Sequence, residues 1–192
     1  LASVLAKSKG EEVVVRDGNN SVPAELFRTL RTNIRFMQPK DVKCPVVLVT
    51  SSMNGEGKSY VATNLAVSMA LLGKKVALVG LDLRKPMLAK YLNLPSQGCL
   101  TNYLSDEAYT LEDVVVASSV KNLDVLPAGI VPPNPSELLQ SDRLAVLFAE
   151  LRERYDYVVV DSAPVALVSD TYLLDRIADM TIFVCRYKYT PS

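Results

Sequence analysis

The chain has 192 residues, of which 49% are hydrophobic and 22% are charged, a composition typical of one globular domain with a sizeable core. Lysine plus arginine and aspartate plus glutamate number 21 each, so the formal net charge is zero, which argues against a polycation that binds nucleic acid. Histidine is absent, which excludes His-based zinc sites and Ser-His-Asp triads, and three widely separated cysteines predict free thiols in a reducing cytoplasm.

Residues 1–20 are expected to form a loose N-terminal leader with a short strand inside GEEVVVRDGNN (10–20). The next stretch, SVPAELFRTLRTNIRFMQ (21–38), predicts a helix, because Ser21 stands near its start, Pro23 falls in its first turn and apolar residues recur every three or four positions. No run reaches the roughly 18 apolar residues that cross a bilayer. The chain does not begin with methionine, which indicates a fragment of a longer protein.

Continuous apolar runs, typical of parallel strands buried on both faces, predict strands at residues 45–50, 75–80, 123–129, 155–161 and 180–185. Helical patterns separate them, including 59–72, which stops at Gly73, and 135–155, with a break near Ser141. Alternating strands and helices predict an α/β fold: a single doubly wound, mostly parallel sheet with helices on both faces. Ligands of such folds bind beyond the carboxyl ends of the strands.

The stretch SSMNGEGKSY (51–60) lies between the first predicted strand and the next helix. It fits the phosphate-binding pattern G-x-x-x-x-G-K-[ST] at Gly57, Lys58 and Ser59, but Ser52 stands where the first glycine belongs. Its amides are expected to surround an anion at the positive end of the helix, with Lys58 on the terminal phosphates. The alternative is a Gly-rich turn with a chance lysine. The predicted nucleotide-binding residues are Asn54, Gly55, Glu56, Gly57, Lys58, Ser59 and Tyr60.

Two other strand ends carry carboxylates. Asp82 and Arg84 follow the second predicted strand in LVGLDLRKP, where the alternative is a surface ion pair. Asp161 ends the apolar run VVVD, the Walker B arrangement, whose carboxylate holds magnesium directly or through water. Three such ends on one sheet predict a site for a nucleotide phosphate and Mg²⁺. The predicted catalytic residues are Lys58, Asp82, Asp161 and Arg84, and the predicted metal ligands are Ser59, Asp82 and Asp161.

With these motifs, the sequence resembles the bacterial tyrosine kinases (BY-kinases) that control capsule and exopolysaccharide export. SSMNGEGKS is similar to the family's Walker A loop, LDLRKP to the end of its Walker A′ motif and YDYVVVDSAPV to its Walker B segment. PAGIVPPNPSELL (127–139) and ELFRTLR (25–31) also match family stretches, the second as the E-x-x-R-x-x-R helix. The resemblance runs from about residue 25 to residue 190.

The resemblance implies a kinase domain over residues 21–192 that transfers phosphate from ATP, in trans, to a C-terminal tyrosine tail of a neighbouring copy. It implies a ring homo-oligomer built through the helix at about 22–37, with Glu25, Arg28 and Arg31 facing a partner; the alternative is a solvated helix face. It also implies a transmembrane polysaccharide co-polymerase or activator, fused or separate, a cognate tyrosine phosphatase, and a location at the cytoplasmic face of the plasma membrane.

Three departures from the family keep other functions open. Gly80 replaces the first aspartate of the D-x-D-x-R pattern, which motivates an ATP-binding ring subunit with little kinase activity. Tyr187 and Tyr189 follow the last predicted strand directly and are not expected to be the tail, and the helix and strand expected after that strand are missing. A partitioning-type nucleotide-switch ATPase shares the fold, although Met53 stands where such proteins carry a signature lysine.

Overall fold

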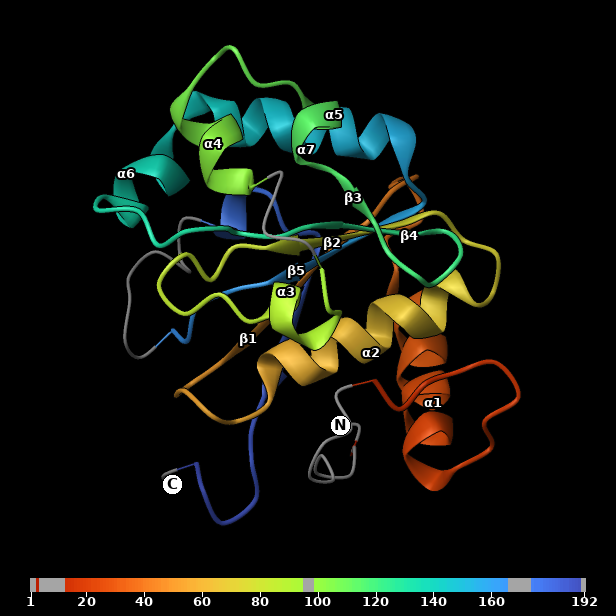
Figure 1. Ribbon diagram of the computed structural model, residues 1–192. Helices are drawn as coiled ribbons and strands as arrows, with labels where there is room; N and C mark the ends of the chain where they lie inside the picture. Colours follow the sequence, from red (N-terminus) through yellow and green to blue (C-terminus); the bar gives the residue numbers. More distant parts are fainter. Residues whose placement is uncertain (1–2, 4–12, 95–98, 166–173, 191–192) are drawn as a thin grey trace.

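The computed structural model describes residue 3 and residues 13–94, 99–165 and 174–190 of the chain. Its described part is an α/β domain with one six-stranded sheet, in the order β3-β4-β2-β5-β1-β6 (Figure 1). All neighbouring strands are parallel except β3 and β4, which run antiparallel. The strands are β1 (Val46–Ser51), β2 (Val76–Gly80), β3 (Val116–Ala117), β4 (Leu123–Leu126), β5 (Tyr157–Asp161) and β6 (Met180–Val184).

The helices lie on both faces of the sheet. They are α1 (Val22–Met37), α2 (Lys58–Ala70), α3 (Leu88–Tyr91), α4 (Leu100–Ser105), α5 (Leu111–Val114), α6 (Pro135–Gln140) and α7 (Asp142–Arg154), with a 3-10 turn, η1, at Leu174–Arg176. Figure 1 shows α4 to α7 above the sheet and α1 to α3 below it. The predicted doubly wound fold is therefore confirmed. No helix in the described ranges is long and apolar enough to span a bilayer.

Alternation along the central strands divides the core between the two faces. Val46 and Leu48 of β1 belong to the cluster beneath α4 to α7, whereas Val47 and Val49 belong to the cluster with α1 and α2. Each strand side chain thus points to one layer or the other, as the period of two in a β-strand requires. Because both faces are covered, the central strands read as unbroken apolar runs, which is why the sequence located them.

Helix α2 is buried along its whole length, because α1 and an N-terminal segment cover its outer side. The ring of Phe27 in α1 meets the ring of Tyr60 in α2 edge to face, with centroids 5.5 Å apart. On the same side, the Asn64 side-chain oxygen of α2 accepts hydrogen bonds from the amides of Val14, at 2.8 Å, and Val15, at 3.2 Å. Helix α1 and the N-terminal segment therefore form a further layer outside α2, and this layer supports the helix that begins at the phosphate loop.

Two expectations about the elements differ from the structure, and one strand was not predicted. Residues 13–20, the described part of the stretch 10–20, form no strand, and the amides of Val14 and Val15 bond to the Asn64 side chain instead of to a neighbouring strand. The strand expected at 123–129 ends at Leu126, since the carbonyls of Pro127 and Ala128 accept the first amides of α4. The two-residue strand β3 was not predicted. The break near Ser141 is confirmed, between α6 and α7.

Candidate nucleotide-binding site

The loop between β1 and α2 leaves helix amides available for an anion. Gly57 is the N-cap of α2 and adopts a left-handed conformation, with φ of 101°. Because glycine has no side chain, the N-cap makes no side-chain hydrogen bond to the first turn of the helix. The amides of that turn and the positive end of the helix dipole therefore face the mouth of the loop, the arrangement that binds phosphate groups in other proteins.

The Glu56 carboxylate bonds to the residues that begin the phosphate loop. It accepts the Ser52 hydroxyl, at 2.8 Å to Oε1, and the Met53 amide, at 2.7 Å. Burial acts to raise the pKa of Glu56, but hydrogen bonds from Thr190, Met53 and Ser52 outweigh it, so the pKa lies below its usual value. Ser52, which breaks the standard pattern at its first glycine, thus serves the loop through its hydroxyl. Sequence reasoning used only the backbone of Glu56 and missed this carboxylate.

Lys58 and Asp82 form a buried ion pair at the start of α2. The Lys58 ammonium nitrogen lies 2.9 Å from Asp82 Oδ2, and the two side chains are 9% and 4% exposed. The other carboxylate oxygen, Oδ1, accepts the Lys85 amide at 2.9 Å. The turn after β2 therefore fixes Asp82 opposite the first residue of α2, and the structure brings these two predicted residues together.

Asp161 completes the cluster from β5, the strand between β1 and β2. Its side chain is buried, and its carbonyl accepts the amides of Leu81, at 2.8 Å, and Asp82, at 3.1 Å. Burial raises the pKa of Asp161 to about 7; the Lys58 charge and a hydrogen bond from the Ser59 hydroxyl act to lower it, and the Asp82 charge acts to raise it. A carboxylate in this position is poorly stabilised as an anion unless a cation approaches.

The oxygen atoms of this cluster suit Mg²⁺. Within the described residues, Asp82 Oδ2 and Asp161 Oδ1 are buried without a hydrogen-bond partner, although Lys58 lies close to the first. The Ser59 hydroxyl bonds to Asp161 beside them. Magnesium takes a few protein oxygens and completes its shell with phosphate and water, so a large acidic cage is unnecessary. Accordingly, the described residues contain no group of three or more His, Cys, Asp or Glu side chains placed to bind a metal.

Two predicted site residues make contacts outside the cluster. The Arg84 side chain is exposed, and its Nη2 donates to the Ser136 hydroxyl of α6 at 3.1 Å. The ring of Tyr60 packs against Phe27 of α1, so that this residue can offer the loop its backbone amide but not its ring.

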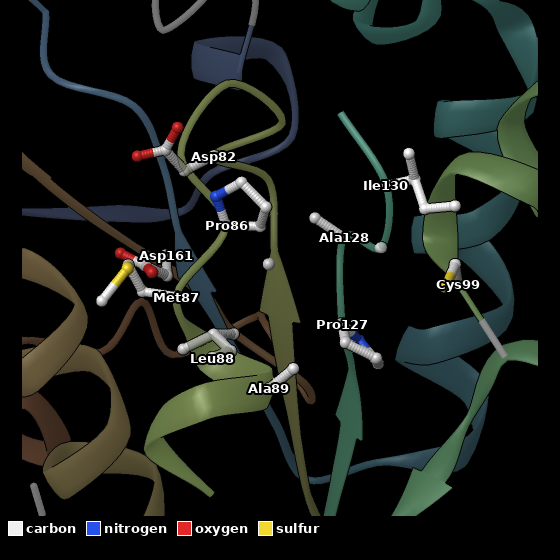
Figure 2. A pocket seen from close by; sticks show the side chains of 12 residues that line it. Asp82, Pro86, Met87, Leu88, Ala89, Cys99, Pro127, Ala128, Ile130 and Asp161 are labelled. Atoms are coloured by element: carbon white, nitrogen blue, oxygen red, sulfur yellow. The ribbon is translucent and has the colours of Figure 1, made fainter. Parts of the chain in front are cut away.

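A mainly apolar cavity of about 190 Å³ adjoins the two aspartates, and no sequence motif predicted it. Figure 2 shows Asp82 and Asp161 at one side of this cavity and Ile130 and Cys99 at the other. Gly80 lines it, and a Cβ at this position would lie 3.2 Å from the Ala128 amide nitrogen and from Leu88 Cδ1. The remaining lining residues are Pro86, Met87, Leu88, Ala89, Pro127, Ala128 and Gly129.

The predicted oligomerisation residues lie on α1 and make contacts within their own chain. Arg28 pairs with Glu25, and its Nη2 donates to the Asn19 carbonyl at 2.7 Å. Arg31 Nη1 donates to the Ser68 carbonyl of α2 at 2.7 Å and to the Ser68 hydroxyl at 3.1 Å. Glu25 is exposed, so of the three it presents the most accessible charge.

Comparisons with known proteins identify the family and the fold of the chain. Residues 45–190 match the AAA domain family, a match that covers β1 to β6 and the phosphate loop. The chain is 40% identical to tyrosine-protein kinase YwqD of Bacillus subtilis over 184 residues, which covers 94% of this chain and 77% of that protein. It is 31% identical to tyrosine-protein kinase ptk of Acinetobacter johnsonii over 98% of this chain but only 25% of that protein.

Among solved structures, the kinase domain of the Escherichia coli tyrosine kinase ETK matches with a TM-score of 0.86 and 29% identity, covering 91% of this chain and 68% of that one. The fold and the loop therefore define the chain as a P-loop nucleotide-binding domain of the AAA domain family. More closely, it belongs to the bacterial tyrosine-protein kinases, as the resemblance implied. The relatives favour this family over the partitioning-type ATPase.

Proposed function

We propose that the chain is an ATP-dependent protein-tyrosine kinase of the type that regulates polysaccharide polymerisation and export. The observation that carries the proposal is the buried cluster of Lys58, Asp82 and Asp161 at the mouth of the phosphate loop, in which Lys58 pairs with Asp82 and the Asp161 Oδ1 oxygen has no hydrogen-bond partner among the described residues. Lys58 would bind the β- and γ-phosphates of ATP, and Ser59 and Asp161 would hold Mg²⁺, which supplies charge neutralisation when bound.

In this proposal the Lys58–Asp82 pair is the resting arrangement of the site. Nucleotide phosphates would draw the Lys58 ammonium away from Asp82 and leave that carboxylate facing the γ-phosphate and the entering hydroxyl. A tyrosine oxygen then forms a bond to the γ-phosphorus, the bond from the γ-phosphorus to its bridging oxygen breaks, and the tyrosine proton passes to Asp82. The site would release ADP and phosphotyrosine, with Arg84 at the rim stabilising transferred charge.

The assignment is tested by labelling the full-length protein with γ-labelled ATP. Lys58→Met is expected to lower tyrosine labelling by at least about 100-fold, since a buried charge that faces the phosphates is lost. Lys74→Met is the matched control, because the Lys74 side chain is 49% exposed and its nearest acid, Asp156, is 3.9 Å away, at the other end of α2 from the loop. Labelling of Lys58→Met at the wild-type rate would refute the proposal.

We further infer that the chain acts as a ring homo-oligomer in which one copy phosphorylates the tyrosine tail of the next. The exposed Glu25 on α1, next to Arg28, supports this as a charged contact for a neighbouring copy. Phosphorylation of the tail would add negative charge and loosen the ring by repulsion.

A membrane partner and a location at the cytoplasmic face of the plasma membrane belong to the same proposal. The chain matches only a quarter of the length of ptk, which is consistent with kinase domains of this family working beside other segments, fused or separate. A transmembrane polysaccharide co-polymerase is the proposed partner, and a cognate tyrosine phosphatase would reverse the modification. Co-purification from detergent-solubilised membranes, compared with the soluble fraction, tests this association.

One observation favours a second function, an ATP-binding ring subunit with little kinase activity. Gly80 removes a carboxylate from the Walker A′ pattern, and the space near its backbone is occupied by Ala128 and Leu88. The labelling experiment separates the two functions, because such a subunit would bind ATP and assemble but leave its tyrosines unlabelled.

A further inference from the structure

The segment after β6 folds into a compact turn, residues 186–190, referred to below as the C-terminal turn. The amides of Tyr189 and Thr190 both donate to the Arg186 carbonyl at 3.0 Å, and the Arg186 amide donates to the Thr190 hydroxyl at 2.8 Å. The Arg186 guanidinium also lies over the Tyr189 ring, 5.2 Å from its centroid. These contacts pre-arrange three side chains of one short segment on the same side.

The C-terminal turn lies against the phosphate loop because β6 pairs with β1, with Val184 opposite Ser51. The Tyr189 hydroxyl donates to the Asn54 carbonyl at 3.0 Å, and Arg186 Nη1 donates to the Gly55 carbonyl at 3.2 Å. Two consecutive carbonyls of the loop are therefore held from outside, by residues more than 130 positions away in the sequence.

Two other contacts tie the same segments together. The Thr190 hydroxyl bonds to the Glu56 carboxylate, the group that also accepts the Ser52 hydroxyl at the start of the loop. At Gly55, which has φ of 85°, a Cβ would lie 3.0 Å from the Tyr189 hydroxyl oxygen. The side of Gly55 where a side chain would stand thus faces the Tyr189 hydroxyl, whereas nothing lies within 4 Å of a Cβ at Gly57.

Peptide geometry links these outer contacts to the inner face of the loop. In a planar trans peptide the carbonyl and the following amide point in opposite directions, and no cis peptide occurs in the described chain. Fixing the Asn54 carbonyl outward therefore turns the Gly55 amide inward, and fixing the Gly55 carbonyl does the same for the Glu56 amide. These are amides that a phosphate in the loop would contact.

We propose that Tyr189, Arg186 and Thr190 are positioning residues that hold the phosphate loop in its anion-binding conformation. Tyr189 and Arg186 act through the loop backbone, Thr190 acts through the Glu56 side chain, and none of the three touches the phosphates. This inference rests on the proposed function, since it assumes that the loop binds nucleotide phosphates. A loop held in place before binding loses less conformational entropy when the anion enters, so release of the turn lowers affinity for phosphates.

Tyr189→Phe tests the first contact, because it removes the hydroxyl and keeps the ring. We expect the affinity of the full chain for Mg-ADP, measured by calorimetry, to fall roughly three- to tenfold, the size of one partly exposed hydrogen bond. Hydrogen exchange of the loop amides in the nucleotide-free protein is expected to accelerate in the same variant. Tyr187→Phe is the matched control, since Tyr187 lies on the same turn and is 87% exposed.

A second pair of variants examines Thr190. Thr190→Val keeps the branched shape and removes the hydroxyl, so it is expected to weaken Mg-ADP binding and accelerate loop exchange, as Tyr189→Phe does. Thr190→Ser keeps the hydroxyl and is expected to restore both quantities to near the wild-type values. If Thr190 acted through packing alone, Thr190→Ser would weaken Mg-ADP binding and accelerate loop exchange more than Thr190→Val, because valine preserves the shape of threonine better than serine does.

The inference is overturned if Tyr189→Phe leaves either loop exchange or Mg-ADP affinity at the wild-type value, or if Tyr187→Phe changes both equally. Failure of the proposed function gives a different result: wild-type protein would then bind no Mg-ADP at all. If the wild-type protein binds Mg-ADP and Tyr189→Phe has the same affinity and loop exchange, the positioning role is rejected but the proposed function is not.

Discussion

Asp161 is a carboxylic acid whose burial makes stability depend on pH. Its pKa is about 7 in the folded chain, against an ordinary value of 3.8. Between these values the folded state holds a proton that the unfolded state has released, so stability falls as pH rises from about 4 to 7, and the full cost of the buried charge is present above pH 7.

We therefore expect Asp161→Asn to stabilise the nucleotide-free, chelator-treated protein at pH 8, by an amount on the order of a few kcal/mol, and to have a much smaller effect at pH 5. Thermal unfolding at both pH values measures the difference. Glu107→Gln, at an exposed acid in a turn, is the control. An Asp161→Asn variant that is less stable at pH 8 would show that the carboxylate is already compensated.

At Gly80, an added carboxylate would favour catalysis, whereas the added Cβ would disturb the packing. An aspartate there would restore the family's carboxylate, but its Cβ would press on Ala128 and Leu88, each at 3.2 Å. We expect both Gly80→Asp and Gly80→Ala to cost roughly 1–2 kcal/mol of stability, measured by urea unfolding. Faster tyrosine labelling by Gly80→Asp than by Gly80→Ala would show that the missing carboxylate limits the rate. Equal rates would indicate that Asp82 suffices.

Single residues of the site divide into those that a sequence reveals and those that it does not. Lys58, Asp82 and Asp161 follow strands or open a helix, and parallel strands bring such positions to one edge, so their convergence was predictable. The contact of Tyr189 with the loop depends on β6 lying beside β1, a pairing that no local pattern specifies.

At the scale of elements, α2 depends on the segment that covers its outer side. The buried Asn64 side chain accepts two amides from residues 14 and 15 and donates to the Tyr60 carbonyl at 2.9 Å. Asn64→Ala is expected to leave these groups without partners and to lower the free energy of unfolding by about 2–4 kcal/mol. Urea titration measures the loss, with the exposed Asn33→Ala as the control. A loss equal to that of the control would mean that the segment contributes no stability.

The strands of the central sheet are the elements that could be located from the sequence. Strands buried on both faces leave unbroken apolar runs, and β1, β2 and β5 were located from these runs. Val14 and Val15 belong to a similar apolar run, but they are buried by contact with a helix and not within a sheet. The strand predicted from this run alone was therefore wrong. The strand β3 has only two residues, too few to show a period.

At the scale of the whole molecule, the proposed ring requires contacts between copies. We expect Glu25→Lys to shift assemblies toward monomers at micromolar concentration, because the reversed charge would repel a basic partner surface and its own neighbour Arg28. Sedimentation velocity measures the distribution, and Glu107→Lys is a control with the same change of charge at another exposed position. Unchanged assembly of Glu25→Lys would remove α1 from the proposed interface.

The most direct test of the account is calorimetric titration of the full-length protein with ADP, with and without Mg²⁺. The buried Asp161 Oδ1 oxygen has no hydrogen-bond partner and needs a cation beside the phosphates, so we expect ADP to bind in the presence of Mg²⁺. The affinity is expected to fall at least about tenfold in chelator, and Asp161→Asn is expected to abolish this dependence on the metal. Absence of binding by folded wild-type protein with Mg²⁺ present, or equal affinity with and without the metal, would contradict the account.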